Sequence, residues 1–569
     1  MNEINSQKLI VLGFDGATPG LLLKWAEEGE LPNLKRIMET GAFGSLRSVP
    51  NMSSPAAWST FATGKNPGKH GIYRFTERKS DSYGYRYINA TFRQAITFWE
   101  ILCAKDSTRV GCVINVPMTY PSEEINGCMI SGFDAPDADS SGACTPSSLI
   151  QELRANCGFY EITRDFADLL RKGDNWGQVA DHMLVTMEMR YKCMLYLMNK
   201  FDWNIFTIVF GETDHAQHFY WKFMDENHPD YKKQEAQKYG NTILKVYKKM
   251  DEICGRIVES NKTANIIIVS DHGGGINARG GSLVADWLER LGYLKMASEE
   301  RSHIKGTISR TVRNFANKGY RQANSRLSTK MKLRLIRFLP GLRESVESAV
   351  RLGGIDWTNT KAYCDGVQDD IWVNLSGRDP LGIVDYDEYD QICEYLVSEL
   401  KDAVDVNTGL PIVESVFRRS EKYQGAFVNR SADITFNWKP EAVINGIESQ
   451  HARPVREPKN WDWPVDLPTG GHSMDGILLA TGPLVKQKVV INEAQLMDIA
   501  PTILYFFDEE IPQDMDGKVL TEIFASDYLA ANPPRSSAAT GQLKEEQEDI
   551  YSEEDSSVIE QRLKDLGYI

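Results

Sequence analysis

The chain has 569 residues, 42% of them hydrophobic and 25% charged, a composition typical of one large globular domain or of two to three smaller ones. Its nine cysteines form no CxxC pair, so we expect neither a disulfide framework nor a zinc ribbon. Because no apolar run approaches the roughly 20 residues that cross a bilayer, and the first residues lack the pattern of a signal peptide, we expect a cytoplasmic chain.

In chain order, five apolar runs have the character of strands, and each is followed by helical or loop sequence. They are residues 8–15, 109–117, 203–210, 264–271 and 476–482. Near-continuous apolar runs indicate strands that are buried on both faces, which is typical of a mostly parallel sheet with helices on each side. The fold class is therefore predicted to be a three-layer α/β/α sandwich.

The net charge of −15 is unevenly distributed, because residues 301–343 carry 12 Lys or Arg and no Asp or Glu. This helix-prone segment interrupts the α/β pattern and predicts an inserted basic cap. A solvated helical lid is the favoured interpretation. A surface for anionic lipid headgroups or nucleic acid would use the same charges and is the open alternative, although nucleic acid is not an expected partner.

The same reading divides the chain into four parts. A small mixed α/β subregion is predicted after the basic cap, and an acidic segment with a short amphipathic helix follows a linker rich in Pro, Ser and Ala. The expected division is a catalytic domain whose first part is 1–295, the cap at 296–354, the rest of the domain at 355–530, and the linker and tail at 531–569.

Four clusters of carboxylates and imidazoles lie next to the ends of these apolar runs. They are Asp15, the stretch GETDHAQH at 211–218, the stretch SDHGGG at 270–275 and the stretch GGHSMDG at 470–476. A single Asp after a strand is equally well explained as a helix cap. Four such clusters, however, favour a shared site, because active sites in these sheets gather beyond the carboxyl ends of the strands.

The residue types in the clusters indicate a metal site. Asp214 and His218 are four apart, so they share one face of a helix. With Asp271, His272, His472 and Asp15, and with Ser54 included, the clusters supply seven oxygen and nitrogen donors, enough for two zinc-like ions. The other six histidines lack a comparable setting and are interpreted as structural: His70, His182, His215, His228, His303 and His451.

These motifs resemble the alkaline phosphatase superfamily, in particular its type I phosphodiesterase and nucleotide pyrophosphatase family. The resemblance extends from residue 8 to about 525. It is carried by VLGFDG, by a hydroxyl residue nine positions before Thr63-Gly64 with NPGKHGI following, by Asp214 and His218, by SDHG, by the late GGH, and by DIAPTIL with DMDGKVL.

The resemblance implies an α/β/α sandwich that binds two divalent ions, usually zinc. It assigns Asp15, Asp271 and His272 to the ion that also holds the nucleophile, and it assigns the second ion to Asp214, His218 and His472. Counting back nine residues from Thr63 selects Ser54 as the nucleophile that becomes phosphorylated. The implied reaction is hydrolysis with retention at phosphorus.

The local sequence around Ser54 agrees with that role. Pro55 follows it, and proline is favoured at the first helical position, so Ser54 is predicted to be the N-cap of a helix. An oxygen at this place faces free backbone N–H groups and the positive end of the helix dipole. A cap serine with no catalytic role would give the same local pattern, and the metal-ligand clusters favour the nucleophile.

Two neighbouring patterns narrow the substrate class. Ala56 and Trp58 do not fit the C/S-x-P-x-R motif of sulfatases, so cleavage of sulfate esters is not expected. Phe75 stands where nucleotide pyrophosphatases commonly have a phosphate-binding Asn, which weakens the case for nucleotides. Phe75 and Tyr73 are interpreted either as packing residues or as the lining of a pocket for the leaving group, and Trp58 as a packing residue.

The sequence therefore predicts a metal-dependent phosphodiesterase that cleaves a small phosphodiester or pyrophosphate through a phosphoseryl Ser54. Two Zn²⁺ ions are the expected cofactors, with Mn²⁺ as the alternative. A transferase that passes the same phosphoryl group to an alcohol, and a phosphomonoesterase, are the competing functions.

Overall fold

The computed structural model describes residues 7–163, 166–171, 175–277, 281–297, 352, 354–364, 369–456, 468–541, 550–566 and 568. The predicted basic cap at 296–354 lies almost entirely outside these residues. Among the helices that the structure describes, none has both the length and the apolar character needed to cross a membrane. All nine cysteines are described, and all are free thiols.

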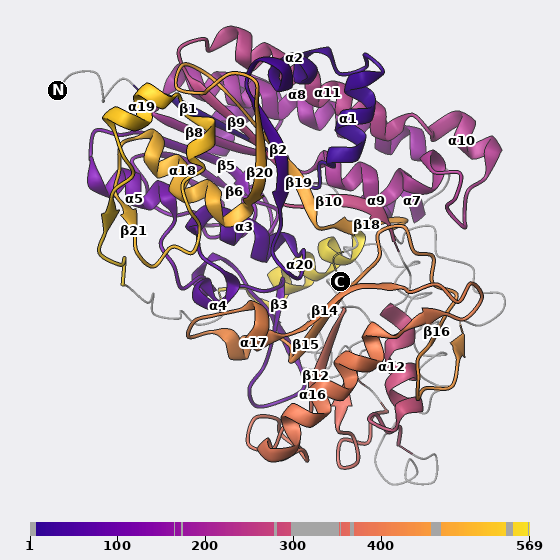
Figure 1. Cartoon of the computed structure of the whole chain (residues 1–569). Coiled ribbons are helices and arrows are strands. Elements are labelled where there is room, and N and C mark those ends of the chain that lie inside the picture. The colour runs from indigo at the N-terminus through magenta and orange to yellow at the C-terminus, as the bar shows by residue number, and fades with distance from the viewer. Residues whose placement is uncertain are drawn as a thin grey trace.

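A nine-stranded sheet forms the centre of the described chain (Figure 1). Its strands are β1 (Leu9–Phe14), β2 (Ala42–Arg47), β5 (Gly111–Val116), β6 (Gly127–Ser131), β7 (Cys144–Thr145), β8 (Ile205–Phe210), β9 (Asn265–Val269), β19 (Asp475–Thr481) and β20 (Val489–Gln495). Their order is β20-β2-β19-β9-β1-β8-β5-β6-β7. The central pairs β9-β1, β1-β8 and β8-β5 are parallel. β19, in contrast, runs antiparallel to both of its neighbours.

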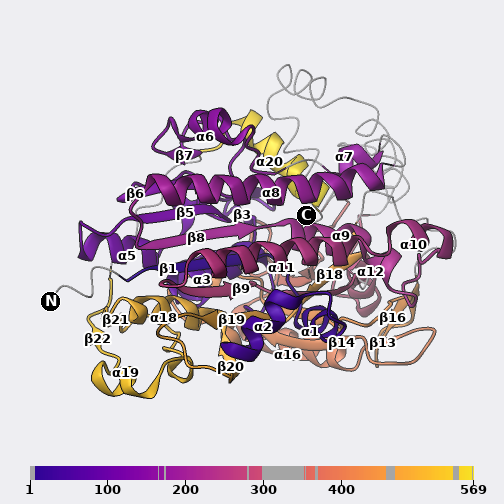
Figure 2. The same ribbon diagram turned by 90° about the horizontal axis from the view of Figure 1, so that it is seen from above.

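Side chains of β1 alternate between two hydrophobic cores. Ile10, Leu12 and Phe14 enter one core, and Leu9 and Val11 enter the other, as the two-residue period of a strand requires. Helices therefore cover both faces, and Figure 2 shows the long α8 lying along the sheet. The predicted α/β/α sandwich is confirmed.

The main helices that cover the central sheet divide between these two cores. The first core takes side chains from α1 (Pro19–Glu27), α2 (Pro32–Thr40), α6 (Leu149–Cys157), α8 (Trp176–Lys200), α9 (Glu212–Met224) and α11 (Thr242–Ser260). The second takes side chains from α3 (Ser54–Thr63), α5 (Phe98–Lys105) and α18 (Ile499–Phe506).

A smaller α/β portion with its own core lies below the main sheet in Figure 1. Its four-stranded sheet has the order β11-β12-β15-β14. The bounds are β11 (Ala362–Tyr363), β12 (Asp370–Val373), β14 (Val413–Arg418), β15 (Ile434–Trp438), α12 (Gly281–Leu291) and α16 (Tyr386–Lys401), with a three-stranded sheet of β13 (Val404–Asp405), β16 (Gly446–Glu448) and β17 (Val455–Arg456). Although α12 precedes the basic segment in the chain, Val284 and Trp287 of this helix are buried in the core of the smaller portion.

Short elements connect these parts. The helices are α4 (Pro67–His70), α7 (Phe166–Arg171), α10 (Lys233–Tyr239), α17 (Arg419–Lys422), α19 (Ser526–Ala531) and α20 (Glu553–Leu566), and the strand pairs are β3 (Thr76–Arg78) with β4 (Tyr85–Tyr87), β10 (Gly273–Ile276) with β18 (Gly470–Ser473), and β21 (Ile511–Pro512) with β22 (Ser536–Ser537). The pair β10-β18 matters most for the site, because it joins two of the polar clusters.

Candidate metal centre and nucleophile

Three parallel neighbours of the central sheet deliver carboxylates to one edge. Asp15 follows the last residue of β1, and Asp271 follows β9 after one residue. Asp214 lies in the first turn of α9, the helix that begins just after β8. Because β9, β1 and β8 are adjacent and parallel, their carboxyl ends meet at this edge.

His472 reaches the same edge from the opposite direction. β19 is antiparallel, so it begins where its parallel neighbours end, and His472 lies three residues before its start on β18. β18 pairs with β10, with His472 opposite Gly274. This pairing brings the fourth cluster beside Asp271 and His272, which immediately precede β10.

The first candidate metal group consists of Asp15, Asp271 and His272, whose ligand atoms all lie within 4.8 Å of one another. The His272 Nε2 is 3.3 Å from Asp271 Oδ2 and 3.6 Å from Asp15 Oδ1. All three side chains are buried. They form a compact set of hard oxygen and nitrogen donors.

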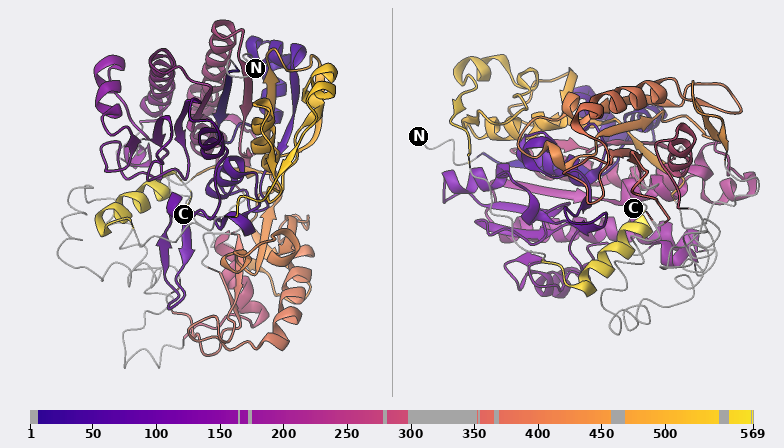
Figure 3. Two further views of the ribbon diagram at one scale, coloured as in Figure 1. Left: turned by 90° about the vertical axis from the view of Figure 1, so that its left-hand side faces the viewer. Right: turned by 90° about the horizontal axis from the view of Figure 1, so that it is seen from below.

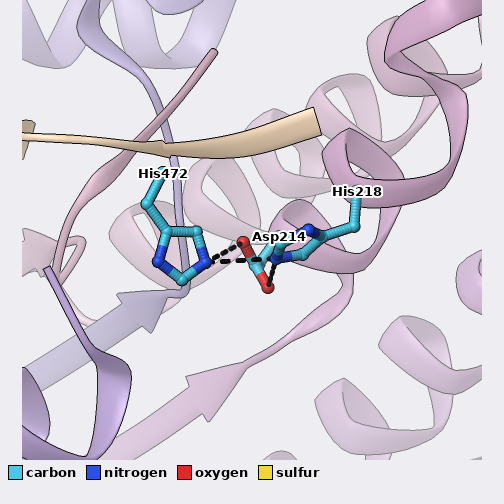
Figure 4. A group of neighbouring side chains, drawn as sticks. All are labelled: Asp214, His218 and His472. Carbon is cyan, nitrogen blue, oxygen red and sulfur yellow. Dashed lines mark hydrogen bonds and ion pairs between the residues drawn. The ribbon is translucent and has the colours of Figure 1, made fainter. Parts of the chain in front are cut away.

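The second group consists of Asp214, His218 and His472, which meet the same distance limit (Figure 4). His218 Nε2 is 3.1 Å from Asp214 Oδ2 and 3.1 Å from His472 Nε2. His472 Nε2 is 3.7 Å from Asp214 Oδ1. The two groups adjoin, because the rings of His272 and His472 stack with their centroids 3.7 Å apart.

Ser54 lies at the start of α3, beside the first group. Its Oγ is 3.2 Å from His272 Nε2. The predicted N-cap position is wrong by one residue: Ser53 is the cap, and its carbonyl accepts the Ala57 N–H. Pro55 is then the second helical residue, which the helix tolerates because the first-turn N–H groups have no intrahelical partner. Ser54 still lies among these free N–H groups.

Hydrogen bonds at Nδ1 orient the three histidines so that Nε2 faces the other ligands of each group. In His218, His272 and His472, Nδ1 lies 2.9, 2.9 and 2.8 Å from a backbone carbonyl oxygen. A carbonyl only accepts, so Nδ1 carries the proton and donates it, which leaves a lone pair on Nε2. This arrangement is typical of metal-ligating histidines.

Two buried carboxylate oxygens favour a bound cation at this site. Asp15 Oδ1 and Asp271 Oδ2 have no hydrogen-bond partner among the described residues, although buried polar atoms normally have one. Burial, together with the nearby carboxylates of Asp271 and Asp214, raises the pKa of Asp15 well above its usual range. A divalent ion would remove both penalties, so the donor sets fit two such ions.

In the second group the pKa values of His472 and Asp214 are shifted downward. Burial and the neighbouring His272 hold the pKa of His472 well below its usual range. Burial alone would raise the pKa of Asp214, but the imidazoles of His218 and His472 bring it below the ordinary value. Asp214 is thus an ionised carboxylate and His472 a neutral imidazole, the protonation states that ligation requires. Burial alone would lower the pKa of His218, but the Asp214 carboxylate raises it above the ordinary value, so an ion that binds there would displace a proton.

The two aromatic candidates lie in different surroundings. The Tyr73 ring packs on Tyr423, and its hydroxyl donates to the Phe427 carbonyl, so its contacts are with the smaller portion. Phe75 is buried, with its ring centroid 5.3 Å from those of Phe133 and Tyr568. The two metal groups contain none of the remaining described histidines, which are His70, His182, His215, His228 and His451, and His303 lies outside the described residues.

Sequence reasoning missed two side chains that hydrogen-bond the candidate ligands. Trp58 packs its indole closely over Gly13, where a Cβ would lie 2.7 Å from the ring, and its Nε1 donates to Asp15 Oδ2 at 2.9 Å. Tyr568 donates its hydroxyl to Asp214 Oδ2 at 2.8 Å. Trp58 lies one helical turn after Ser54, a spacing that points to a shared face, whereas no sequence signal connects Tyr568 with Asp214.

Comparison with known proteins places the chain in a family. A family model described as type I phosphodiesterase / nucleotide pyrophosphatase matches residues 9–337. No curated protein sequence matches the chain. Similar solved structures include phosphonoacetate hydrolase from Sinorhizobium meliloti 1021 in complex with phosphonoformate, with 14% identity, 88% of this chain and 95% of that chain covered, and a TM-score of 0.48. Human ectonucleotide pyrophosphatase / phosphodiesterase 5 has 12% identity, covers 92% and 99% of the two chains, and has a TM-score of 0.45.

Proposed function

The chain belongs to the type I phosphodiesterase / nucleotide pyrophosphatase family of phosphoric ester hydrolases, and on this premise we propose that it cleaves a small phosphodiester or pyrophosphate through a phosphoseryl intermediate on Ser54. The observation that carries the proposal is the convergence on one sheet edge of the Ser54 hydroxyl and two three-ligand groups.

Each group would hold one divalent ion, for which we propose Zn²⁺, with Mn²⁺ as the alternative. Asp15, Asp271 and His272 would bind the ion near Ser54, and Asp214, His218 and His472 the other. Bound there, the ions would supply Lewis-acid chemistry: they lower the pKa of a hydroxyl and stabilise negative charge on phosphoryl oxygens.

The chain's own groups account for the remaining steps. Ser54 Oγ lies 3.2 Å from His272 Nε2, whose lone pair would be given to the first ion, so the proton of the Ser54 hydroxyl passes to solvent when the hydroxyl ionises. Ser54 Oγ then attacks phosphorus, the bond to the leaving oxygen breaks, and the leaving group takes up a proton. Free N–H groups at the start of α3 face the phosphoryl oxygens. Water subsequently attacks the phosphoserine and restores Ser54, so two inversions give net retention.

The test compares three aryl esters on the chain loaded with Zn²⁺ or Mn²⁺: a bis-aryl phosphate, the matching monoester and the matching sulfate ester. We expect the diester to be preferred. Ser54→Ala should lower kcat by at least about a thousandfold, as expected for loss of a nucleophile. Ser59→Ala is the matched control, because Ser59 is a buried serine on the same helix and its Oγ has no partner within the described part of the chain.

Each result decides a different part of the proposal. Undiminished turnover by Ser54→Ala would refute the mechanism, and a preference for the monoester would refute the diesterase class. A phosphorylated peptide containing Ser54, trapped by acid quenching, is the expected intermediate. Transfer products that form with added alcohols in place of hydrolysis would identify a transferase.

A further inference from the structure

The helix α20 holds Tyr568 at the metal centre from a distant part of the sequence. Ile559, Leu563 and Leu566 of α20 are buried in the first core, at the three- and four-residue spacing of one helix face. The Tyr568 N–H donates to the Leu563 carbonyl at 2.8 Å, which ties Tyr568 to the end of the helix. Figure 3 shows α20 as the yellow helix that ends at the point marked C.

Polar contacts fasten α20 to the loop that follows β6. The Tyr551 hydroxyl donates to the Asp134 carbonyl at 2.7 Å. The Arg562 guanidinium donates to the carbonyls of Phe133 and Pro136 at 2.8 and 2.6 Å, and also to the Ala135 carbonyl. Because this loop also carries the ring on which Tyr568 stacks, its position and that of Tyr568 are set together.

The Tyr568 side chain contacts both the second metal group and the rings of Phe133 and Phe75. Its hydroxyl donates to Asp214 Oδ2 at 2.8 Å, and its ring centroid is 5.8 Å from that of His218. Its ring also stacks on Phe133, with centroids 5.5 Å apart and planes 8° apart, and it contacts Phe75. Phe75 thus packs against the ring whose hydroxyl bonds to Asp214.

We propose that Tyr568 is a positioning residue for Asp214, and that α20 with Phe75 and Phe133 exists in part to hold its hydroxyl at that carboxylate. A hydrogen bond to a ligating carboxylate fixes its orientation and commonly changes metal affinity 10- to 100-fold when it is removed. This assignment uses the metal sites of the proposed function. It gives Phe75 a supporting role through its contact with the Tyr568 ring.

The experiment is a Zn²⁺ titration of the metal-depleted full-length chain by calorimetry, with wild type and Tyr568→Phe compared. The variant keeps the ring and loses only the hydroxyl. We expect one of the two ions to bind about 10- to 100-fold more weakly, and the other to bind as in wild type. Tyr389→Phe is the matched control, because its hydroxyl donates to the Asp433 carboxylate at 2.8 Å in the smaller portion.

A second variant tests the role of α20 in positioning the Tyr568 hydroxyl. Arg562→Ala removes the bonds to the loop after β6 without touching Asp214. If α20 positions the hydroxyl, this variant should weaken the same ion, by less than Tyr568→Phe does. Circular dichroism at the titration temperature verifies that each variant is folded.

Other results would overturn the proposal. Unchanged affinities, equal weakening of both ions, or tighter binding by Tyr568→Phe would each contradict it, and tighter binding would mean that the phenol obstructs the group. A wild-type chain that binds no Zn²⁺ would overturn this assignment and the metal sites together. A chain that binds two ions and cleaves no phosphoester would contradict the proposed function only, and the titration would still decide the role of Tyr568.

Discussion

Replacing Trp58 with Phe should weaken the ion held by Asp15. The Trp58 indole is fully buried, and its Nε1 donates to Asp15 Oδ2 at 2.9 Å. The other oxygen, Oδ1, has no partner within the described residues. The substitution therefore removes the Trp58 hydrogen bond to this carboxylate, and it leaves a smaller ring in the same core.

The size of the effect follows from that bond. A hydrogen bond to a charged group contributes about 1.5–3 kcal/mol, and each 1.4 kcal/mol is about tenfold in affinity. Loss of the bond should therefore weaken the first ion roughly 10- to 150-fold. The second group has no hydrogen bond from Trp58, so its ion should bind as before.

The assay is the calorimetric Zn²⁺ titration, accompanied by urea unfolding. Trp99→Phe is the matched control, because Trp99 is also fully buried and its Nε1 donates to Glu123 Oε2 at 2.7 Å. Each variant loses a hydrogen bond to a carboxylate, and each loses the same atoms of the indole ring. We therefore expect each to lower the free energy of unfolding by about 2–4 kcal/mol. Only Trp58→Phe should change metal affinity.

Two results would refute this reasoning. If Trp58→Phe and Trp99→Phe changed Zn²⁺ affinity equally, the effect would come from general loosening of the core. If Trp58→Phe left both affinities unchanged, the bond to Asp15 would have no role in orienting a ligand, and the original interpretation of Trp58 as a packing residue would suffice.

Three further predictions concern stability. The pKa of His70 is lowered from 6.5 to about 3, chiefly by burial. Below pH 6.5 the unfolded state therefore binds a proton that the folded state does not, and the free energy of unfolding decreases as the pH falls. Between pH 6.5 and about 5.5, urea unfolding should show wild type losing about 1 kcal/mol more than His70→Gln, and equal losses would contradict the burial of a neutral imidazole. Gly16 has φ +67°, and a Cβ there would lie 2.8 Å from Asp214 Oδ1, so Gly16→Ala should cost about 1–2 kcal/mol and also weaken Zn²⁺. Gly29→Ala, at φ +83° with nothing within 4 Å, should share the backbone cost alone, and identical Zn²⁺ affinities in the two variants would exclude the contact with Asp214. Removing the ions with a chelator should lower the free energy of unfolding by about 2.7 kcal/mol per site when free Zn²⁺ had stood at about 100 times its Kd, whereas no change would argue against resident ions.

Much of the fold was predictable because the strands are buried on both faces. The runs at 8–15, 203–210 and 264–271 became β1, β8 and β9, adjacent in the centre of the sheet. Their apolar character reports burial, and polar residues at their ends report a shared edge. The direction of the run at 476–482 was not predictable, because a short apolar run has the same pattern whether its neighbours are parallel or antiparallel.

The sequence by itself determined the family, the central sheet and the residue types of the two candidate metal-ligand groups, because these depend on local pattern and on the order of motifs along the chain. Only the tertiary structure decided that His472 lies opposite Gly274, that Trp58 and Tyr568 hydrogen-bond Asp15 and Asp214, and that Phe75 packs against Tyr568. These contacts join residues up to several hundred positions apart. They depend on strand order, on the docking of α20 and on the packing of rings, none of which leaves a periodic or compositional trace in the sequence.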